Sequence, residues 1–195
     1  MEAGMGIMLF IVLLFLAVSS IALFFLKRDK QTLYMLGLCF SFILMFVGII
    51  IYLAKTGGLS QAQKLFLFFD TRIQRKLSYL IFPLRKLGYM IAIGRYLFPT
   101  FLLLIAVNYS MIPWVLRYKK RSWMVFILPA VSLGIYYPDI FFKLVRSRFT
   151  LQLFLMKASV SWIYLYLIAA VGLLVCEYRG TTIPSRRPSG LRKTI

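Results

Sequence analysis

Five long stretches of apolar residues, separated by short basic segments, dominate the pattern of this chain. A helix needs about 20 consecutive apolar residues to cross the ~30 Å hydrocarbon core of a bilayer. The pattern predicts five such helices, at about 5–26, 32–54, 97–116, 123–142 and 158–176. The predicted fold class is therefore an all-α integral membrane protein with about five transmembrane helices.

Two of these stretches are interrupted by proline, which removes a backbone donor and can kink a helix. Pro113 lies in the third stretch and Pro129 in the fourth. The fourth is also short: it runs from Trp123 to about Tyr137, and reaches Phe142 only if the helix is tilted. The first stretch has no basic residues before it and is longer than a signal-peptide core, so we interpret it as a retained transmembrane helix.

The segment between the second and third stretches, at about 60–96, mixes cations with apolar residues at helical spacing. This pattern is typical of an amphipathic segment in the headgroup region, with its apolar side toward the lipid. The alternative is a re-entrant or lumen-lining hairpin packed on the spans. The predicted contacts with lipid headgroups are Arg72, Arg75, Lys76, Arg85, Lys86 and Arg95. Residues 140–157 show a smaller version of the same pattern.

The composition is typical of a membrane protein, and a change in composition near residue 180 divides the chain into two parts. Hydrophobic residues make up 62% of the chain and the mean hydropathy is +0.86, well above the roughly half-apolar content of soluble domains. We expect a multi-pass membrane domain at 1–179 and a short, basic, disordered tail at 180–195, where the composition changes to Gly, Thr, Pro, Ser and Arg.

The net charge of +19 comes from 24 Lys and Arg residues that lie between the apolar stretches. Basic charge beside spans indicates topology and contact with an anionic bilayer; a nucleic-acid partner is not expected. The cations divide equally between the two sides, but the clusters at 27–30 and 117–121 lie directly at helix ends, where the positive-inside bias is strongest. We therefore predict a cell-membrane location with the N-terminus outside and the C-terminus in the cytoplasm.

The residues available for chemistry are few. The chain has no histidine and five acidic residues, Glu2, Asp29, Asp70, Asp139 and Glu177, none in the middle of an apolar stretch. The usual acid–base pairs and metal clusters are hard to build from such a set. We expect no catalytic, metal or cofactor site and no enzyme activity. The absence of a central charge in any span also weakens proton-coupled transport.

Other polar residues within the spans are interpreted mainly as packing groups. Asn108, a lone intramembrane amide in the third stretch, is expected to form an interhelical hydrogen bond more often than to serve a function. The serines in or beside the spans are expected to allow close helix packing. Tyrosine and tryptophan near the span ends, including Tyr136 and Tyr137, indicate an aromatic belt.

The middle of the chain resembles the membrane-embedded N-terminal region of certain bacterial sensor histidine kinases. The likeness covers about 55–179, and its motifs are KLFLFF at 64–69, QRKLSYL at 74–80, PLRKLGY at 83–89 and IGRYLFP at 93–99. In that family a cytoplasmic module follows, with a phospho-accepting histidine and an ATP-binding domain. This chain has neither a histidine nor a Gly-rich ATP site.

The resemblance implies a non-catalytic sensor region of a two-component system, standing alone as from a truncated or interrupted reading frame; a short natural tail explains the change at 180 equally well. A stimulus at the basic loop or bilayer would shift helix packing and reach a cytoplasmic signalling partner, and a homodimer is also compatible. The alternative is a small membrane subunit of a transporter or permease.

Overall fold

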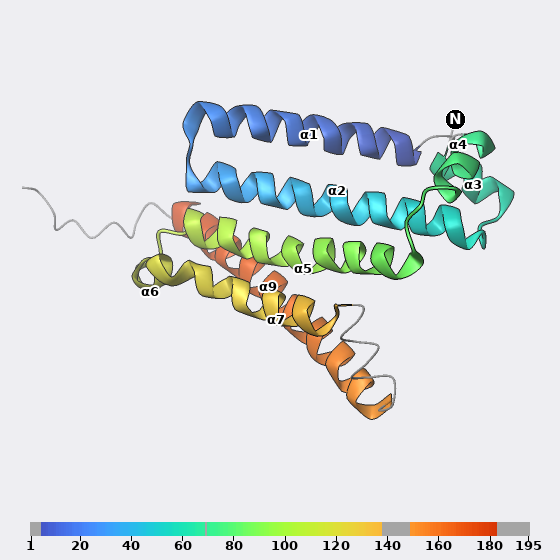
Figure 1. Cartoon of the computed structure of the whole chain (residues 1–195). Helices are drawn as coiled ribbons and strands as arrows, with labels where there is room; N and C mark the ends of the chain where they lie inside the picture. Colours follow the sequence, from blue (N-terminus) through green and yellow to red (C-terminus); the bar gives the residue numbers. More distant parts are fainter. Residues whose placement is uncertain (1–4, 69, 138–148, 183–195) are drawn as a thin grey trace, which may run out of the picture.

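The computed structural model describes residues 5–68, 70–137 and 149–182, and these residues are helical without any strand. The elements follow each other as α1 (Met5–Lys27), α2 (Lys30–Thr56), α3 (Gln61–Phe68), α4 (Thr71–Ser78), α5 (Leu84–Tyr109), α6 (Pro113–Tyr118), the 3-10 helix η1 (Lys119–Phe126), α7 (Ile127–Ile135) and α9 (Phe149–Thr182) (Figure 1). The predicted all-α class is confirmed for the described part of the chain.

Four of these helices are long and apolar enough to cross a membrane: α1, α2, α5 and α9. The predicted first and second spans are confirmed within a few residues of their predicted ends. The fifth predicted span, 158–176, lies inside α9, which extends well beyond it at its N-terminal end. The predicted count of five therefore exceeds the four candidate spans among the described residues.

Among the first three long helices, α1, α2 and α5, each runs antiparallel to the one before it (Figure 1). Ring contacts join Phe10 of α1 to Phe46 of α2, and Phe42 of α2 to Phe98 of α5. Helices α2 and α5 approach each other closely at Gly94, which brings the backbone of α5 against Ser41. Small residues at a helix interface permit this close approach in membranes.

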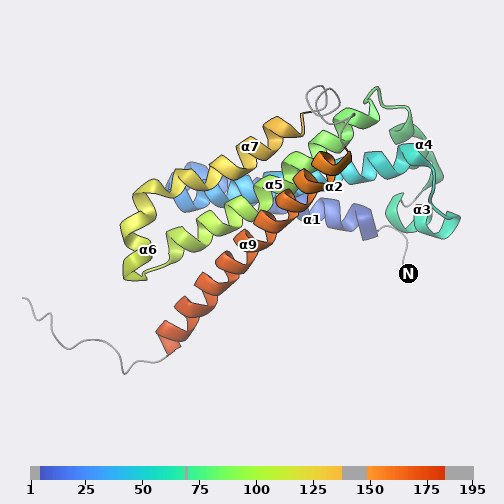
Figure 2. The same ribbon diagram turned by 90° about the horizontal axis from the view of Figure 1, so that it is seen from below.

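Helices α5 and α9 run parallel to each other, although they are neighbours in the bundle. Tyr96 contacts Trp162, Leu103 packs with Ala170, and Ser110 meets Glu177, so the two helices advance together. The segment from α6 through η1 to α7 runs in the opposite direction along both (Figures 1 and 2). Phe101 of α5 meets Phe126, and Tyr89 meets Tyr137 just after α7.

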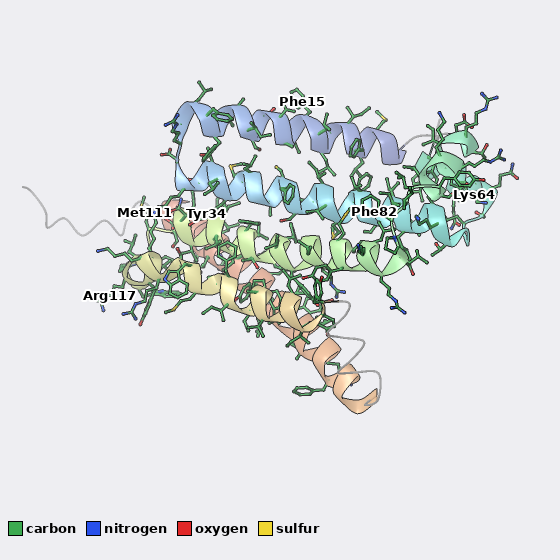
Figure 3. The ribbon with its side chains drawn as sticks, in the orientation of Figure 1. Phe15, Tyr34, Lys64, Phe82, Met111 and Arg117 are labelled. Carbon is green, nitrogen blue, oxygen red and sulfur yellow. The ribbon has the colours of Figure 1, made fainter. Side chains whose placement is uncertain are left out.

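The bundle has two ends, and both carry cations (Figure 3). The hairpin end, residues 57–86, holds α3, α4 and Lys64. The turn end, residues 27–30 and 110–122, holds Arg117 and the turn between α1 and α2. In that turn Arg28 adopts a left-handed backbone conformation (φ 50°), and its N–H donates to the carbonyl of Phe24. Many helices end in this way.

The third span differs from the prediction in its position. We predicted 97–116, whereas α5 covers Leu84–Tyr109, so the end of the predicted interfacial segment belongs to the span. Pro83 precedes the helix, and the cations after it do not interrupt the helix. At the other end Ile112, which precedes Pro113, is extended, because a residue before proline disfavours the α conformation. The chain therefore starts a new helix, α6, at Pro113.

The predicted fourth span, 123–142, does not form one long α-helix in the described residues. Its first part belongs to η1, and α7 contributes nine α-helical residues. Pro129 lies in the first turn of α7, which follows η1 directly. Residues 138–142 of the predicted span lie outside the described part of the chain, as does the predicted tail from 183 onward.

Candidate functional site

The α3–α4 hairpin packs on the ends of α1 and α2. Its first turn is a capping box in which Ser60 and Gln63 bond each other's backbone N–H, and Asp70 caps α4 by accepting from the N–H of Arg72. Phe68 is 1% exposed and borders an apolar cavity of about 280 Å³ with Ile51 and other residues of the hairpin and spans. The apolar side chains of the hairpin therefore hold it against the two spans.

The six predicted headgroup contacts are all exposed, but the structure does not bring them together. Arg72, Arg75 and Lys76 lie on α4, and Arg75 lines a polar groove between α3 and α4. Arg85 and Lys86 lie on the first turn of α5 and line a separate groove of about 390 Å³ with Tyr89 and Tyr137.

An exposed apolar turn lies between these two groups of cations. Residues 79–82 are Tyr, Leu, Ile and Phe, and Ile81 is 98% exposed. The ammonium group of Lys55 at the end of α2 donates to the carbonyl of Leu80, which fastens the turn to the bundle. An apolar turn flanked by cations has the chemistry of a segment that dips into the headgroup region.

Arg95 is separated from the other five: it lies half-way along α5, with its side chain exposed. Its neighbour Gly94 sits against Ser41 and Met45, which occupy the middle of the 27-residue α2. Arg95 is therefore at the level of the middle of a span, about 16 Å along α5 from its start at ~1.5 Å per residue. We expected no central charge in any span, and this expectation was wrong because α5 begins earlier than predicted.

A polar aromatic core joins α5, α7 and α9. The indole N–H of Trp162 donates to the buried hydroxyl of Ser132 at 3.0 Å, and the hydroxyl of Ser159 donates to Tyr136 at 3.2 Å. Tyr96 is 6% exposed and packs against both Trp162 and Tyr136. Tyr136, predicted to lie in an aromatic belt, belongs instead to this core.

Proline 129 explains one bond of the same core. A residue at position 129 would ordinarily donate its N–H to the carbonyl of Val125, and proline has no N–H to give. The hydroxyl of Tyr166 on α9 donates to that carbonyl at 3.0 Å. In a bilayer a freed backbone carbonyl needs such a partner, so α9 completes the backbone bonding of the η1–α7 segment.

Asn108 lies at the penultimate position of α5, near the turn end of the bundle and away from the middle of a span. Its backbone carbonyl accepts a hydrogen bond from the ammonium group of Lys119 at 2.7 Å. The residue also lines a cavity with three lysines. Close by, Glu177 of α9 accepts from the backbone N–H of Met111 at 3.2 Å and pairs with the Ser110 hydroxyl. This carboxylate links the end of α9 to the turn that follows α5.

The described residues contain no group of histidine, cysteine or acidic side chains able to hold a metal ion. Comparison with known proteins finds no match: no family model, no curated protein and no solved structure is significantly similar to this chain. The function is therefore argued from the arrangement of the chain alone.

Proposed function

We propose that this protein is a non-catalytic input unit of a signalling system in the cell membrane. It senses the membrane at the hairpin end and passes a change in helix packing to a cytoplasmic partner. The observation that carries this proposal is α9, a continuous helix of 34 residues that runs beside α5 toward the turn end. A rod of about 51 Å, at ~1.5 Å per residue, is long enough to link two faces of a bilayer.

Five crossings are part of the proposal. Helices α5 and α9 point the same way, so the chain between them has to return across the layer. The returning segment consists of η1 and α7, with eight and nine residues. Its first four residues, 119–122, are three cations and a serine that belong to the turn end. From Trp123 to Ile135, at about 2.0 Å per residue for the 3-10 helix and 1.5 Å for the α-helix, the apolar part reaches roughly 22 Å, which is most of the ~30 Å hydrocarbon core.

The orientation follows from where the cations lie. The turn end gathers the dense clusters at 27–30 and 117–121, and dense clusters at span ends favour the cytoplasmic side. We therefore propose that the turn end and the end of α9 face the cytoplasm, and that the hairpin end faces outward.

The crossings are testable with cysteine placed at Ser60, Arg117 or Tyr137 in a background lacking Cys39 and Cys176. An impermeant thiol reagent applied to intact cells is expected to label positions 60 and 137 and to spare 117. Permeabilised cells, in which all three label, serve as the control. If 137 behaves like 117, the η1–α7 segment stays on one side and the five-crossing arrangement is wrong.

The sensing surface in this proposal is the hairpin with its cations. Arg72, Arg75 and Lys76, and at the start of α5 Arg85 and Lys86, would contact phosphate groups while the turn at 79–82 enters the headgroup layer. Each cation near an anionic surface contributes about 1 kcal/mol, so the surface charge of the bilayer is a stimulus the hairpin can register. The hairpin rests on α1 and α2, so its displacement reaches the bundle.

Transmission is tested by distance measurement. Spin labels are placed at Lys27 and Tyr178, both at the turn end, in the cysteine-free background, and the protein is reconstituted in neutral or anionic nanodiscs. The distance distribution is expected to change with lipid charge, and to stop changing in the R75Q/K76Q variant. The matched control is R117Q, which removes an exposed cation at the opposite end. Identical distributions in both lipids would contradict signalling through α9.

A second candidate function, a small subunit of a transporter or permease, is favoured by Arg95. An ionisable residue inside a membrane marks a functional site by default, and an ion or substrate path is one such site. Fluorescent flux assays in proteoliposomes distinguish the two functions. A transport subunit would lose flux in R95Q when assembled with its partner, whereas a sensor would retain its spin-label response.

A further inference from the structure

The turn end carries a cavity of about 310 Å³ whose chemistry fits a phosphate group. It lies between the start of α2, the end of α5 and the α6–η1 segment. Its polar lining consists of Lys30, Tyr34, Asn108, Lys119, Lys120 and Ser122. No acidic residue is among the described residues that line it. Ammonium groups are strong phosphate binders, and hydroxyl and amide groups supply neutral donors.

Lys119 is held in place at this cavity. Its ammonium group donates to the backbone carbonyl of Asn108 at 2.7 Å, and an ammonium group has three donors. Two donors therefore remain for a ligand, on a side chain whose position is already fixed. Lys30 and Lys120 are exposed at the rim, and Tyr34 is half-buried between α2 and α5.

An apolar groove of about 540 Å³ lies next to the cavity, in the span region. Tyr34 lines both. The groove is formed by α1, α2, α5 and η1, through Ala17, Ile21, Gly37, Phe40, Phe101 and Phe126. The ring of Phe101 already occupies the space beside Gly37, because a Cβ added at position 37 would overlap that ring.

We propose that the cavity and groove together bind one anionic phospholipid. The phosphate would lie among Lys30, Lys119 and Lys120, and an acyl chain would lie in the groove below Tyr34. A free phosphate compound would use only the cavity; the adjoining groove, with its almost wholly apolar lining, is what favours a lipid. Basic pockets between transmembrane helices on the cytoplasmic side are a known way to hold anionic headgroups. This site is separate from the hairpin surface and stands without the sensing proposal.

The test measures retention of phosphatidylglycerol and phosphatidylcholine by the purified chain in detergent, using native mass spectrometry. We expect phosphatidylglycerol to be retained at least tenfold better. The K30Q/K119Q variant is expected to lose most of that preference, because each cation contributes about fivefold on an anionic surface. R117Q, an exposed cation at the same end that does not line the cavity, is the matched control and should retain it.

Two further arms identify the source of the phosphate. A17F places a ring in the groove and is expected to lower lipid retention, whereas V18F, at the next and exposed position of α1, is not. Glycerol 3-phosphate in excess should displace the lipid poorly. If K30Q/K119Q binds like the unchanged protein, the site is refuted. If glycerol 3-phosphate competes fully and A17F has no effect, the cavity binds a soluble phosphate and the lipid assignment is wrong.

Discussion

The close contact between α5 and α2 at Gly94 gives the sharpest prediction, through Gly94→Ala. A Cβ at position 94 would lie 2.6 Å from the Ser41 carbonyl oxygen and 2.8 Å from the backbone nitrogen of Met45. Ordinary contact begins near 3.4 Å. Because backbone atoms of α2 cannot rotate away, the two helices have to separate locally by roughly 0.8 Å in a close-packed interface.

The cost is best read against a matched substitution on the same helix. Gly88 is exposed, and a Cβ added there meets nothing within 4 Å. Both substitutions gain the helix propensity of alanine, about 1 kcal/mol, and only Gly94→Ala pays for overpacking, about 1–3 kcal/mol. The difference between the two variants should therefore be about 1–3 kcal/mol, with Gly88→Ala the more stable.

A third variant, Gly48→Ala, tests whether backbone contact is the cause. Its Cβ would lie 2.7 Å from a side-chain carbon of Ile91, while the nearest backbone atom is 3.5 Å away. The side chain can rotate, so we expect a stability between those of the other two.

The assay is unfolding of the purified protein in mixed micelles with a rising fraction of SDS, followed by tryptophan fluorescence. Native circular dichroism of each variant checks that the helix content is unchanged. If Gly94→Ala unfolds at the same free energy as Gly88→Ala, within about 0.5 kcal/mol, the close α2–α5 contact does not exist in solution.

Three other predictions follow from the polar core and from the composition. Ser132→Ala should destabilise the protein by about 1–3 kcal/mol and shift the emission of Trp162, whereas the exposed Ser161→Ala should do neither. Tyr166→Phe should cost a similar amount, and less in a Pro129→Ala background, because alanine restores a backbone donor; equal costs in both backgrounds would exclude this explanation. Purified protein incubated with labelled ATP should remain unlabelled, because the chain has no histidine to accept a phosphate. Specific stoichiometric labelling would contradict the expectation that the chain has no kinase activity.

The sequence was sufficient for α1 and α2, where apolar residues run uninterrupted between clear charged ends. It misplaced α5 because Arg95 and the cations at 85 and 86 look interfacial on their own. Only the packing of Gly94 on the middle of α2 shows that this stretch is inside the bundle. A cation can end an apolar pattern without ending the helix.

The polar core had no signal of its own in the sequence. Ser132 and Trp162 are 30 residues apart, and their bond depends on the parallel register of α5 and α9 and on α7 packing beside them. Tyr136 was assigned to an aromatic belt for the same reason. The sequence shows that Tyr136 lies near the end of an apolar stretch, but it does not show that Ser159 is its neighbour in space. The partner of the Val125 carbonyl was equally hidden, although Pro129 indicated that one was required.

Helix α1 has its apolar surface almost entirely open, since none of its strongest apolar window is buried and Phe15 is 70% exposed (Figure 3). On its inner side α1 packs on α2, for example through the ring of Phe10 on Phe46 and the Ser20 hydroxyl beside the Cys39 thiol. In a bilayer its exposed apolar side chains would face hydrocarbon, which discriminates weakly among Leu, Ile, Val and Phe. Natural selection can maintain the hydrophobicity of such a helix while its individual residues change freely. We therefore expect the sequence of α1 to carry less information about function than any other part of the protein.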